Sequence, residues 1–350
     1  MQAATKTDEF DWQRVWRVVG AVPGLRIDAK AALNGAVGDR LSADSSRLAI
    51  EMQLMHCARP LDLDSGELPG TAGYSSRIAI FVPGLMAGPT FWNFVTPRPF
   101  PERLAGDRGV TSIHVNYNSG LHISKNGRQL AKMIQKLVDA WPVEVTEINL
   151  IGHSMGGLVS RSTGHYASEL ELPWLSKLRR MILLGAPLRG ASLEQVANIT
   201  AFILNVIPNP WTWAIGWVFQ QRSAGIKDLR HGYIVDEEWK GRSPDSLSMG
   251  REHLIPLLPD VEHFIAAGSL FADEHHPLAK VFGDILVAPF SAKDEGIDGT
   301  PSERTPNHTR VFPGVSHPAM AGDDAVYEQI LAWWGPSAAT LLLEGPTVVG

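Results

Sequence analysis

Short apolar runs that alternate with helical stretches restrict the fold of this chain more than any other feature. Six runs rich in branched aliphatic residues are predicted to be strands: IAIFVPG (78–84), TSIHVNY (111–117), EINLIGH (147–153), RRMILLGAP (179–187), VEHFIAAGSL (261–270) and RVFPGV (310–315). Helical periodicity is found between them, at about 124–141, 155–167 and 325–334. Such an alternation predicts an α/β protein with a mostly parallel central sheet and helices on both faces.

The composition fits a large globular protein and argues against nucleic-acid binding. The chain has 350 residues, of which 44% are hydrophobic and 19% are charged. The formal net charge is -6, so the basic footprint of a nucleic-acid-binding protein is missing. Cys57 is the single cysteine, which excludes an internal disulfide. The first residues lack the apolar segment of a secretory signal peptide, so we expect a cytoplasmic protein.

The pattern divides the chain into four parts. We expect a helical arm without a clear strand at 1–72, a core built from 73–190 and 259–336, an inserted helical cap at 191–258, and a C-terminal tail at 337–350. In the arm, four apolar residues recur at helical spacing: Trp12, Val15, Trp16 and Val19. We favour a helix packed on the main domain, because surface helices normally bury such a stripe; contact with a membrane or a partner is the alternative.

An uncharged segment lies between Glu194 and Arg222 and interrupts the strand-helix rhythm. Its length allows a membrane span, but three asparagines are spread along it, and Pro208 and Pro210 break it in the middle. Two short apolar helices in a cap fit better, with membrane or interface contact as the lesser alternative. The cap tryptophans are candidates for lining an acyl pocket, although packing of the cap is an equal alternative for each one: Trp211, Trp213 and Trp217.

The stretch Gly152-His153-Ser154-Met155-Gly156 fits the pattern G-x-S-x-G. It follows an expected strand and opens an expected helix, which is the context of a nucleophile elbow. The small residues Gly152, Gly156 and Gly157 avoid clashes that a Cβ atom would create in so sharp a turn. Ser154 is therefore the candidate nucleophile, exposed at the carboxyl end of its strand.

A serine nucleophile needs a base, and His317 is the best candidate among twelve histidines. It follows the last expected strand and precedes the last helix, which places it at the same sheet edge as Ser154. His153 adjoins the serine, but its side chain is expected to point away along the turn. His114 lies in a strand and fits the core, and the pair His275 and His276 has no second cluster that would support a metal site.

The acid that orients the base should lie between the serine and the histidine in the chain. Asp284 is the preferred candidate, since a carboxylate among apolar neighbours in FGDILVAPFSA needs a partner. The alternatives are Asp273, Asp294 and Asp298, of which the last two lie in a polar loop.

Backbone N–H groups usually stabilise the oxyanion that forms in acyl transfer. One donor is expected to be Met155, directly after the nucleophile. The other is expected from the loop after IAIFV, where Gly84 lets the backbone bend towards the serine and Leu85 is the chosen donor.

At these residues the chain resembles the α/β-hydrolase superfamily, and most closely the bacterial lipase and esterase branch that includes GPI inositol-deacylase-like proteins. The similar segments are FVPGLMAG, GHSMGG, LLGAPLRGAS, GDILVAPFSA and GVSH, within about 76–335. Two positions differ from the family pattern: Pro83 stands where a histidine is usual, and Ile285 where a glycine is usual.

The motifs together predict a serine hydrolase that cleaves carboxylic esters through an acyl-enzyme, without a cofactor or a metal. Its substrate is expected to be a small acyl ester or a lipid, with peripheral membrane contact as an open option and no indication of the oligomeric state. Two alternatives stay open: an acyltransferase that uses the same triad, and a non-catalytic, membrane-associated binding protein of the same fold.

Overall fold

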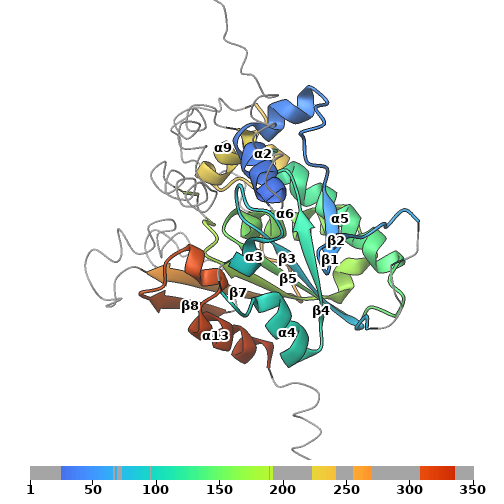
Figure 1. Ribbon diagram of the computed structural model, residues 1–350, viewed down its shortest axis with the longest axis vertical. Helices are drawn as coiled ribbons and strands as arrows, with labels where there is room; N and C mark the ends of the chain where they lie inside the picture. The colour runs from blue at the N-terminus through green and yellow to red at the C-terminus, as the bar shows by residue number, and fades with distance from the viewer. Residues whose placement is uncertain are drawn as a thin grey trace, which may run out of the picture.

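The computed structural model describes most of the core of the chain. The described residues are 25–65, 68, 73–94, 96–188, 190–191, 223–241, 255–269 and 308–335. Within them, eight strands form one sheet in the order β2-β1-β4-β3-β5-β6-β7-β8 (Figure 1). The pairs from β4 through β8 are parallel, whereas β1 pairs antiparallel with β2 and β4. The mostly parallel sheet that the sequence predicts is therefore present.

Each of the six expected strands is found, five of them within two residues of the predicted range, whereas β6 ends three residues earlier than predicted. The strands are β1 Gln53–His56, β2 Arg59–Pro60, β3 Arg77–Val82, β4 Thr111–Asn116, β5 Glu147–His153, β6 Leu178–Leu184, β7 Glu262–Ser269 and β8 His308–Pro313.

The expectation that no strand precedes residue 73 is wrong. β1 has four residues and β2 has two, and neither shows a strong local pattern. β1 forms because it pairs with β4, where Leu54 lies opposite Val115. The turn between β1 and β2 places Cys57 and Ala58 in the left-handed region, with φ of 48° and 60°. This strand is fixed by a partner that lies about sixty residues later, so no short window of sequence predicts it.

Helices cover both faces of the sheet. The described helices are α2 Leu25–Ala43, α3 Phe91–Phe94, α4 Phe100–Arg108, α5 Ile123–Asp139, α6 Met155–Glu169, η1 Pro173–Lys177, α9 Ala224–His231, α10 Asp236–Trp239, η2 Pro318–Ala321 and α13 Asp324–Trp334. The side chain of Asp323 caps α13, because it accepts hydrogen bonds from the N–H groups of Ala325 and Val326.

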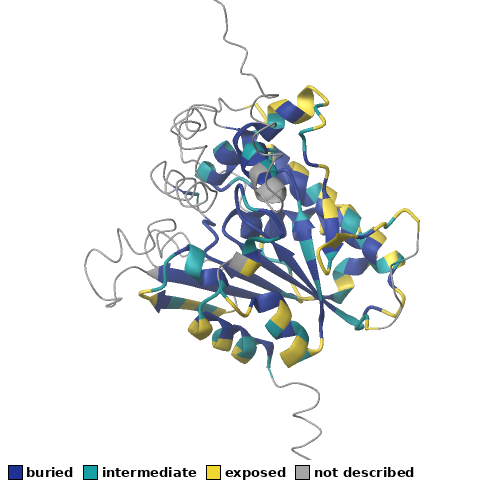
Figure 2. Ribbon diagram, viewed as in Figure 1, coloured by how far each residue is buried: buried dark blue, intermediate teal, exposed yellow. Residues whose placement is uncertain are grey.

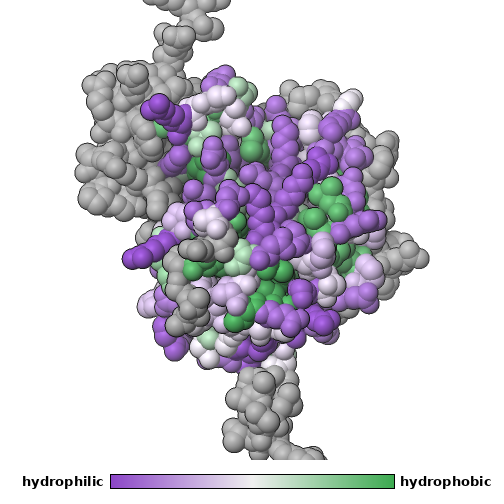
Figure 3. All heavy atoms as spheres, turned by 90° about the vertical axis from the view of Figure 1, so that its right-hand side faces the viewer, coloured by the Kyte–Doolittle hydropathy of each residue, from purple (hydrophilic) through white to green (hydrophobic). Residues whose placement is uncertain are grey.

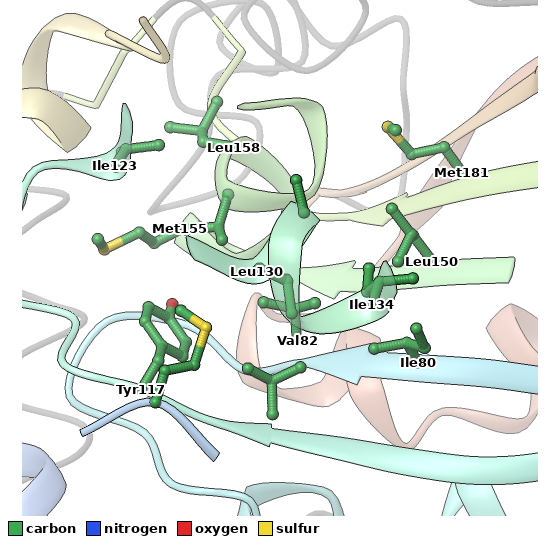
Figure 4. Close-up of a cluster of buried hydrophobic side chains, with 14 of the residues drawn as sticks. Ile80, Val82, Tyr117, Ile123, Leu130, Ile134, Leu150, Met155, Leu158 and Met181 are labelled. Atoms are coloured by element: carbon green, nitrogen blue, oxygen red, sulfur yellow. The ribbon is translucent and has the colours of Figure 1, made fainter. Parts of the chain in front are cut away.

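Two hydrophobic clusters lie on opposite faces of the sheet. Alternate residues of β3 contribute to each: Ile80 and Val82 face the cluster under α5 and α6, which is shown in Figure 4, whereas Phe81 faces the cluster under α4 and α13. All three side chains are fully buried. Figure 2 shows the same division, with buried residues along the strands and exposed residues on the outer sides of α4 and α13.

The helix α2 packs against two segments that lie far from it in sequence. The Oγ of Ser223, just before α9, donates to the carbonyl oxygen of Gly35 at 2.6 Å. The Nδ2 of Asn118, after β4, donates to the carbonyl oxygen of Gly38 at 2.9 Å. The stripe formed by Trp12, Val15, Trp16 and Val19 lies outside the described residues.

The described surface is mainly polar. Val143 and Leu170 are the large hydrophobic side chains among the described residues that count as exposed. On the face drawn in Figure 3, hydrophilic side chains dominate and hydrophobic ones form separate spots. In the described part of the chain, no helix is both long enough and apolar enough to span a membrane.

Candidate active site

Ser154 alone forms the turn between β5 and α6. Its backbone has φ 55° and ψ −125°, a conformation that costs free energy for a residue with a Cβ atom. Two hydrogen bonds hold it: the N–H of Ser154 donates to the carbonyl oxygen of Leu184 at 2.9 Å, and the N–H of Gly157 donates to that of Ser154 at 3.0 Å. The sequence context of a strand, a sharp turn and a helix is therefore present in the structure.

Glycines bring α6 very close to the sheet at this turn. A Cβ atom at Gly156 would lie 2.2 Å from the carbonyl oxygen of Val82, and one at Gly152 would lie 2.5 Å from that of Gly156. Both distances are far below a van der Waals contact, so neither position accepts a larger residue without a shift of the backbone. The sequence-based explanation of these glycines is confirmed.

The hydroxyl of Ser154 lies in a buried, electropositive place. The residue is only 1% exposed, and its Oγ makes no hydrogen bond with the described residues. It precedes the first residue of α6, a helix of 15 residues whose N-terminal end carries a positive partial charge. The expectation that Ser154 is exposed is therefore wrong, and its hydroxyl is buried without a hydrogen bond to any described residue.

The loop between β3 and α3, residues 83–90, lies directly against the serine. A Cβ atom at Gly84 would be 3.0 Å from the Cβ of Ser154. The loop is held from the β4 side: the N–H of Met86 donates to the Oγ of Ser119 at 3.0 Å, and the hydroxyl of Tyr117 donates to the carbonyl oxygen of Pro83 at 2.8 Å. Met86 has a φ of 59°, so this loop, like the elbow, contains a residue with a strained backbone.

Leu85 directly follows Gly84, and Met155 directly follows Ser154. These are the two expected N–H donors. Both side chains are fully buried in the cluster under α5 and α6, and Figure 4 shows Met155 within that cluster. Among the described residues, no acceptor takes the N–H of Leu85 or of Met155. Both N–H groups are therefore unpaired within the described part of the chain.

His317 lies at the same edge of the sheet as Ser154. It follows β8, directly precedes η2 and is 3% exposed. A Cβ atom at Gly185 would be 2.9 Å from the Nδ1 of His317, and Gly185 follows Leu184, the register partner of His153. The end of β6 therefore places the imidazole next to the elbow.

His153 corrects one expectation. Its side chain does not point away from the site: its Nε2 lies 3.0 Å from the carbonyl oxygen of His317, and the two imidazole centroids are 4.8 Å apart. The ring of His153 also stacks on Phe91, with ring centroids 4.7 Å apart. Burial first, and then the nearby His317 ring, lower the pKa of His153 to about 3. Residues two apart in a strand point to the same face of the sheet. Ile151, two residues before His153, belongs to the cluster under α4 and α13, so the side chain of His153 points to that face as well.

The other expected site residues divide into two groups. His114 lies in β4, is partly buried and stacks on Phe81, and burial followed by the charge of His56 lowers its pKa to about 4. The remaining candidates lie outside the described residues: Asp273, Asp284, Asp294, Asp298, His275, His276, Trp211, Trp213 and Trp217.

Ser119 was missed by the sequence analysis. Its hydroxyl bears on the site only because β4 ends beside the β3–α3 loop, and a serine in the run Asn118-Ser119-Gly120 carries no signal of that contact.

The fold and the site together define the class. A mostly parallel, eight-stranded sheet with an antiparallel strand near one edge, and a serine on a strained elbow between a central strand and its helix, is the α/β-hydrolase fold. Residues 117–242, about a third of the chain, match the family model of the PGAP1-like alpha/beta domain.

Several solved structures of lipases and esterases are similar to this chain. The mature lipase BlEst2 of Bacillus licheniformis is 14% identical over 80% of this chain and 97% of that one, with a TM-score of 0.47. A thermophilic esterase of Thermogutta terrifontis is 16% identical over 75% and 90%, with a TM-score of 0.43. An esterase of Pyrobaculum calidifontis is 12% identical over 91% and 95%, with a TM-score of 0.44.

These scores all lie below 0.5, so the fold is assigned from the sheet order and the elbow of the chain itself. A sequence comparison with curated proteins gave no match.

Proposed function

We propose that this protein is a serine hydrolase that cleaves carboxylic esters through an acyl-enzyme intermediate. The observation that carries the proposal is Ser154 itself. A buried serine with a strained backbone sits at the N-terminus of a helix, and its hydroxyl has no structural hydrogen bond with the described residues. Backbone strain of this kind persists where the surrounding structure over-determines it, which is typical of active sites.

In the proposed acylation step, the Oγ of Ser154 attacks the acyl carbonyl carbon, and His317 takes the hydroxyl proton. The N–H groups of Leu85 and Met155 donate to the oxyanion of the tetrahedral intermediate. When this intermediate collapses, the bond to the alcohol breaks and His317 gives its proton to the leaving oxygen. The products of this step are the alcohol and an ester of Ser154.

In the proposed deacylation step, His317 takes a proton from water as the water oxygen attacks the acyl-enzyme. Collapse of the second tetrahedral intermediate breaks the bond to the Oγ of Ser154, and His317 returns the proton to that oxygen. The carboxylic acid leaves, and the enzyme is restored. Asp284 is proposed as the acid that orients His317, because it is a carboxylate in an apolar segment between Ser154 and His317 in sequence.

The proposed substrate is a small acyl ester or a lipid ester. The proposal for its acyl pocket rests on Trp211, Trp213 and Trp217, since an uncharged segment with three tryptophans follows the loop after β6. That loop continues from the end of β6, where Gly185 lies against His317. Large aromatic side chains in such a place exclude water and bury an acyl chain.

The test compares Ser154→Ala with Ser160→Ala. Both serines are buried, but the Oγ of Ser160 only donates to the carbonyl oxygen of Gly156. We expect Ser154→Ala to lose labelling by a fluorophosphonate probe and to lower the hydrolysis of p-nitrophenyl butyrate by at least about 10³-fold. Ser160→Ala should keep both activities. Near-normal turnover by Ser154→Ala, or a wild-type protein that neither reacts with the probe nor hydrolyses esters, contradicts the proposal.

A further inference from the structure

His153 contacts both of the loops that face Ser154. Its Nε2 lies 3.0 Å from the carbonyl oxygen of His317, and a Cβ atom at Gly84 would lie 3.4 Å from its Nδ1. The side chain is 4% exposed, so both contacts are shielded from water. One imidazole thus lies between the loop that carries the proposed base and the loop that carries a proposed oxyanion donor.

The hydrogen bond to His317 defines the state of the His153 ring. A carbonyl oxygen can only accept, so the Nε2 of His153 must carry the proton and donate it. A charged ring is disfavoured here, since burial and the neighbouring His317 ring hold the pKa of His153 at about 3. His153 is therefore a neutral donor at ordinary pH and does not compete with His317 for the proton of Ser154.

The same bond restrains the backbone at the point from which the His317 side chain projects. His317 begins a short 3-10 turn with φ −51° and ψ −48°, and Pro318 follows. The carbonyl oxygen of Ser316 accepts from the N–H of Met320 at 3.1 Å, and the next carbonyl, that of His317, accepts from His153. These two bonds lie on either side of the Cα atom of His317. Stacking on Phe91, at 4.7 Å between centroids, fixes the plane of the donor ring.

We infer that His153 is a positioning residue, which holds the main chain of His317 and so sets the place of the base relative to Ser154. The inference rests on the proposed function of Ser154 and His317. It assigns a role to the variable position of the G-x-S-x-G motif in this chain. An error of about 1 Å in the position of a catalytic group can lower a rate by about 10²-fold, so one restraining hydrogen bond is enough to matter.

Two replacements of His153 by an amide side chain distinguish the effect of the hydrogen bond from the effect of a polar side chain. In His153→Gln, the amide nitrogen reaches the position of the imidazole Nε2 and can donate to the same carbonyl oxygen. In His153→Asn, the amide is one methylene shorter and cannot reach it. His165→Leu, a change of a histidine that lies on α6 away from the elbow, serves as the control.

The measured quantity is kcat for the hydrolysis of p-nitrophenyl butyrate, expressed per active site. The concentration of active sites is determined by titration with a fluorophosphonate probe. Titration removes the effect of misfolded protein, so a purely structural role of His153 leaves this kcat unchanged. We expect His153→Asn to lower it about 10- to 100-fold with little change in KM, and His153→Gln to restore it to within about fivefold of the wild type. His165→Leu should match the wild type.

The outcomes separate this inference from the proposed function. A wild-type protein that shows no Ser154-dependent ester hydrolysis overturns the proposed function. If Ser154-dependent hydrolysis is present and His153→Asn keeps a normal kcat per titrated site, only the role of His153 is overturned. Equal losses in the Gln and Asn variants overturn the role of the hydrogen bond to His317.

Discussion

Two residues with side chains adopt left-handed backbone conformations near the site, one in the elbow and one in the β3–α3 loop. Ser154 has a φ of 55° and Met86 has a φ of 59°. Each such residue costs on the order of 1–3 kcal/mol, so each needs contacts that hold it. Ser154 is held by Leu184, and Met86 is held by the hydroxyl of Ser119. The hydrogen bonds to these residues therefore belong to the site as much as the groups that face the substrate.

At this scale, we predict that Ser119→Ala impairs ester hydrolysis. The substitution leaves the buried N–H of Met86 without its acceptor, which costs about 1–3 kcal/mol. The loop can recover part of this cost by moving, and Leu85 moves with it. We expect kcat for p-nitrophenyl butyrate to fall about tenfold or more, with a smaller change in KM.

Thr163→Val is the matched control for Ser119→Ala. It removes another buried hydroxyl, whose bond goes only to the carbonyl oxygen of Val159 in its own helix. Both variants should unfold at somewhat lower temperature, but only Ser119→Ala should lose turnover. Equal turnover in the two variants would show that the bond between Ser119 and Met86 is structural.

Among the elements, α2 has a position that its own sequence does not reveal. Its contacts with Met86, Asn118 and Ser223 involve segments that lie about fifty to two hundred residues away. Each contact exists only once the sheet has brought the β3–α3 loop and the end of β4 together. The helical arm that the sequence predicts therefore includes a helix that packs against the β3–α3 loop.

We predict that Gly35→Ala in α2 disturbs the site. A Cβ atom at Gly35 would lie 2.3 Å from the Cγ of Met86 and 3.0 Å from its Cα and backbone nitrogen. Since the backbone atoms cannot rotate away, the β3–α3 loop must shift. The expected result is a lower melting temperature together with a lower kcat.

Gly106→Ala in α4 is the control for this change. Nothing lies within 4 Å of a Cβ atom at Gly106, so the alanine should be neutral or should stabilise the helix by roughly 0.5–1 kcal/mol. A normal kcat in Gly35→Ala, measured beside this control, would mean that α2 does not restrain the loop.

For the whole molecule, the sequence predicts the sheet better than it predicts the site. The six longer strands are recognisable because each contains a short run rich in branched aliphatic residues, and the elbow because glycines surround Ser154. The bond between His153 and His317 joins residues 164 positions apart, and only the fold reveals it. Asp284 stays a prediction, since it lies outside the described residues.

The fold also keeps several histidines neutral, which makes the stability of the molecule depend on pH. Burial lowers the pKa of His114 to about 4 and that of His153 to about 3, and it lowers the pKa values of His165 and His231 as well. In the unfolded chain these groups take up a proton near pH 6.5. Between pH 6.5 and about 4 the unfolded state therefore binds more protons than the folded state, and the stability falls as the pH falls.

Asp228 acts in the opposite sense, because burial raises its pKa above the usual value and the folded state takes up that proton first. Burial raises the pKa of Glu147, but hydrogen bonds from Asn149 and Arg77 outweigh it, so the pKa is lowered. In the same way, hydrogen bonds with Ser124, Lys240 and Arg128 outweigh burial and lower the pKa of Asp236. The stabilisation that these two carboxylates contribute to the folded state is lost only at a lower pH.

We therefore predict that the free energy of unfolding decreases when the pH is lowered from 7.5 to 5.5, and that His114→Gln reduces this dependence. A single buried histidine adds a slope of about 1.4 kcal/mol per pH unit once its unfolded form is protonated. Urea unfolding at pH 7.5, 6.5 and 5.5 measures the slope for the wild type and the variant. We expect the variant to be less stable at every pH, because a partly buried side chain that stacks on Phe81 is replaced, but the slope depends only on protons. An unchanged slope in His114→Gln would mean that His114 has the same pKa in the folded and the unfolded protein, and that its place in β4 is accessible to water.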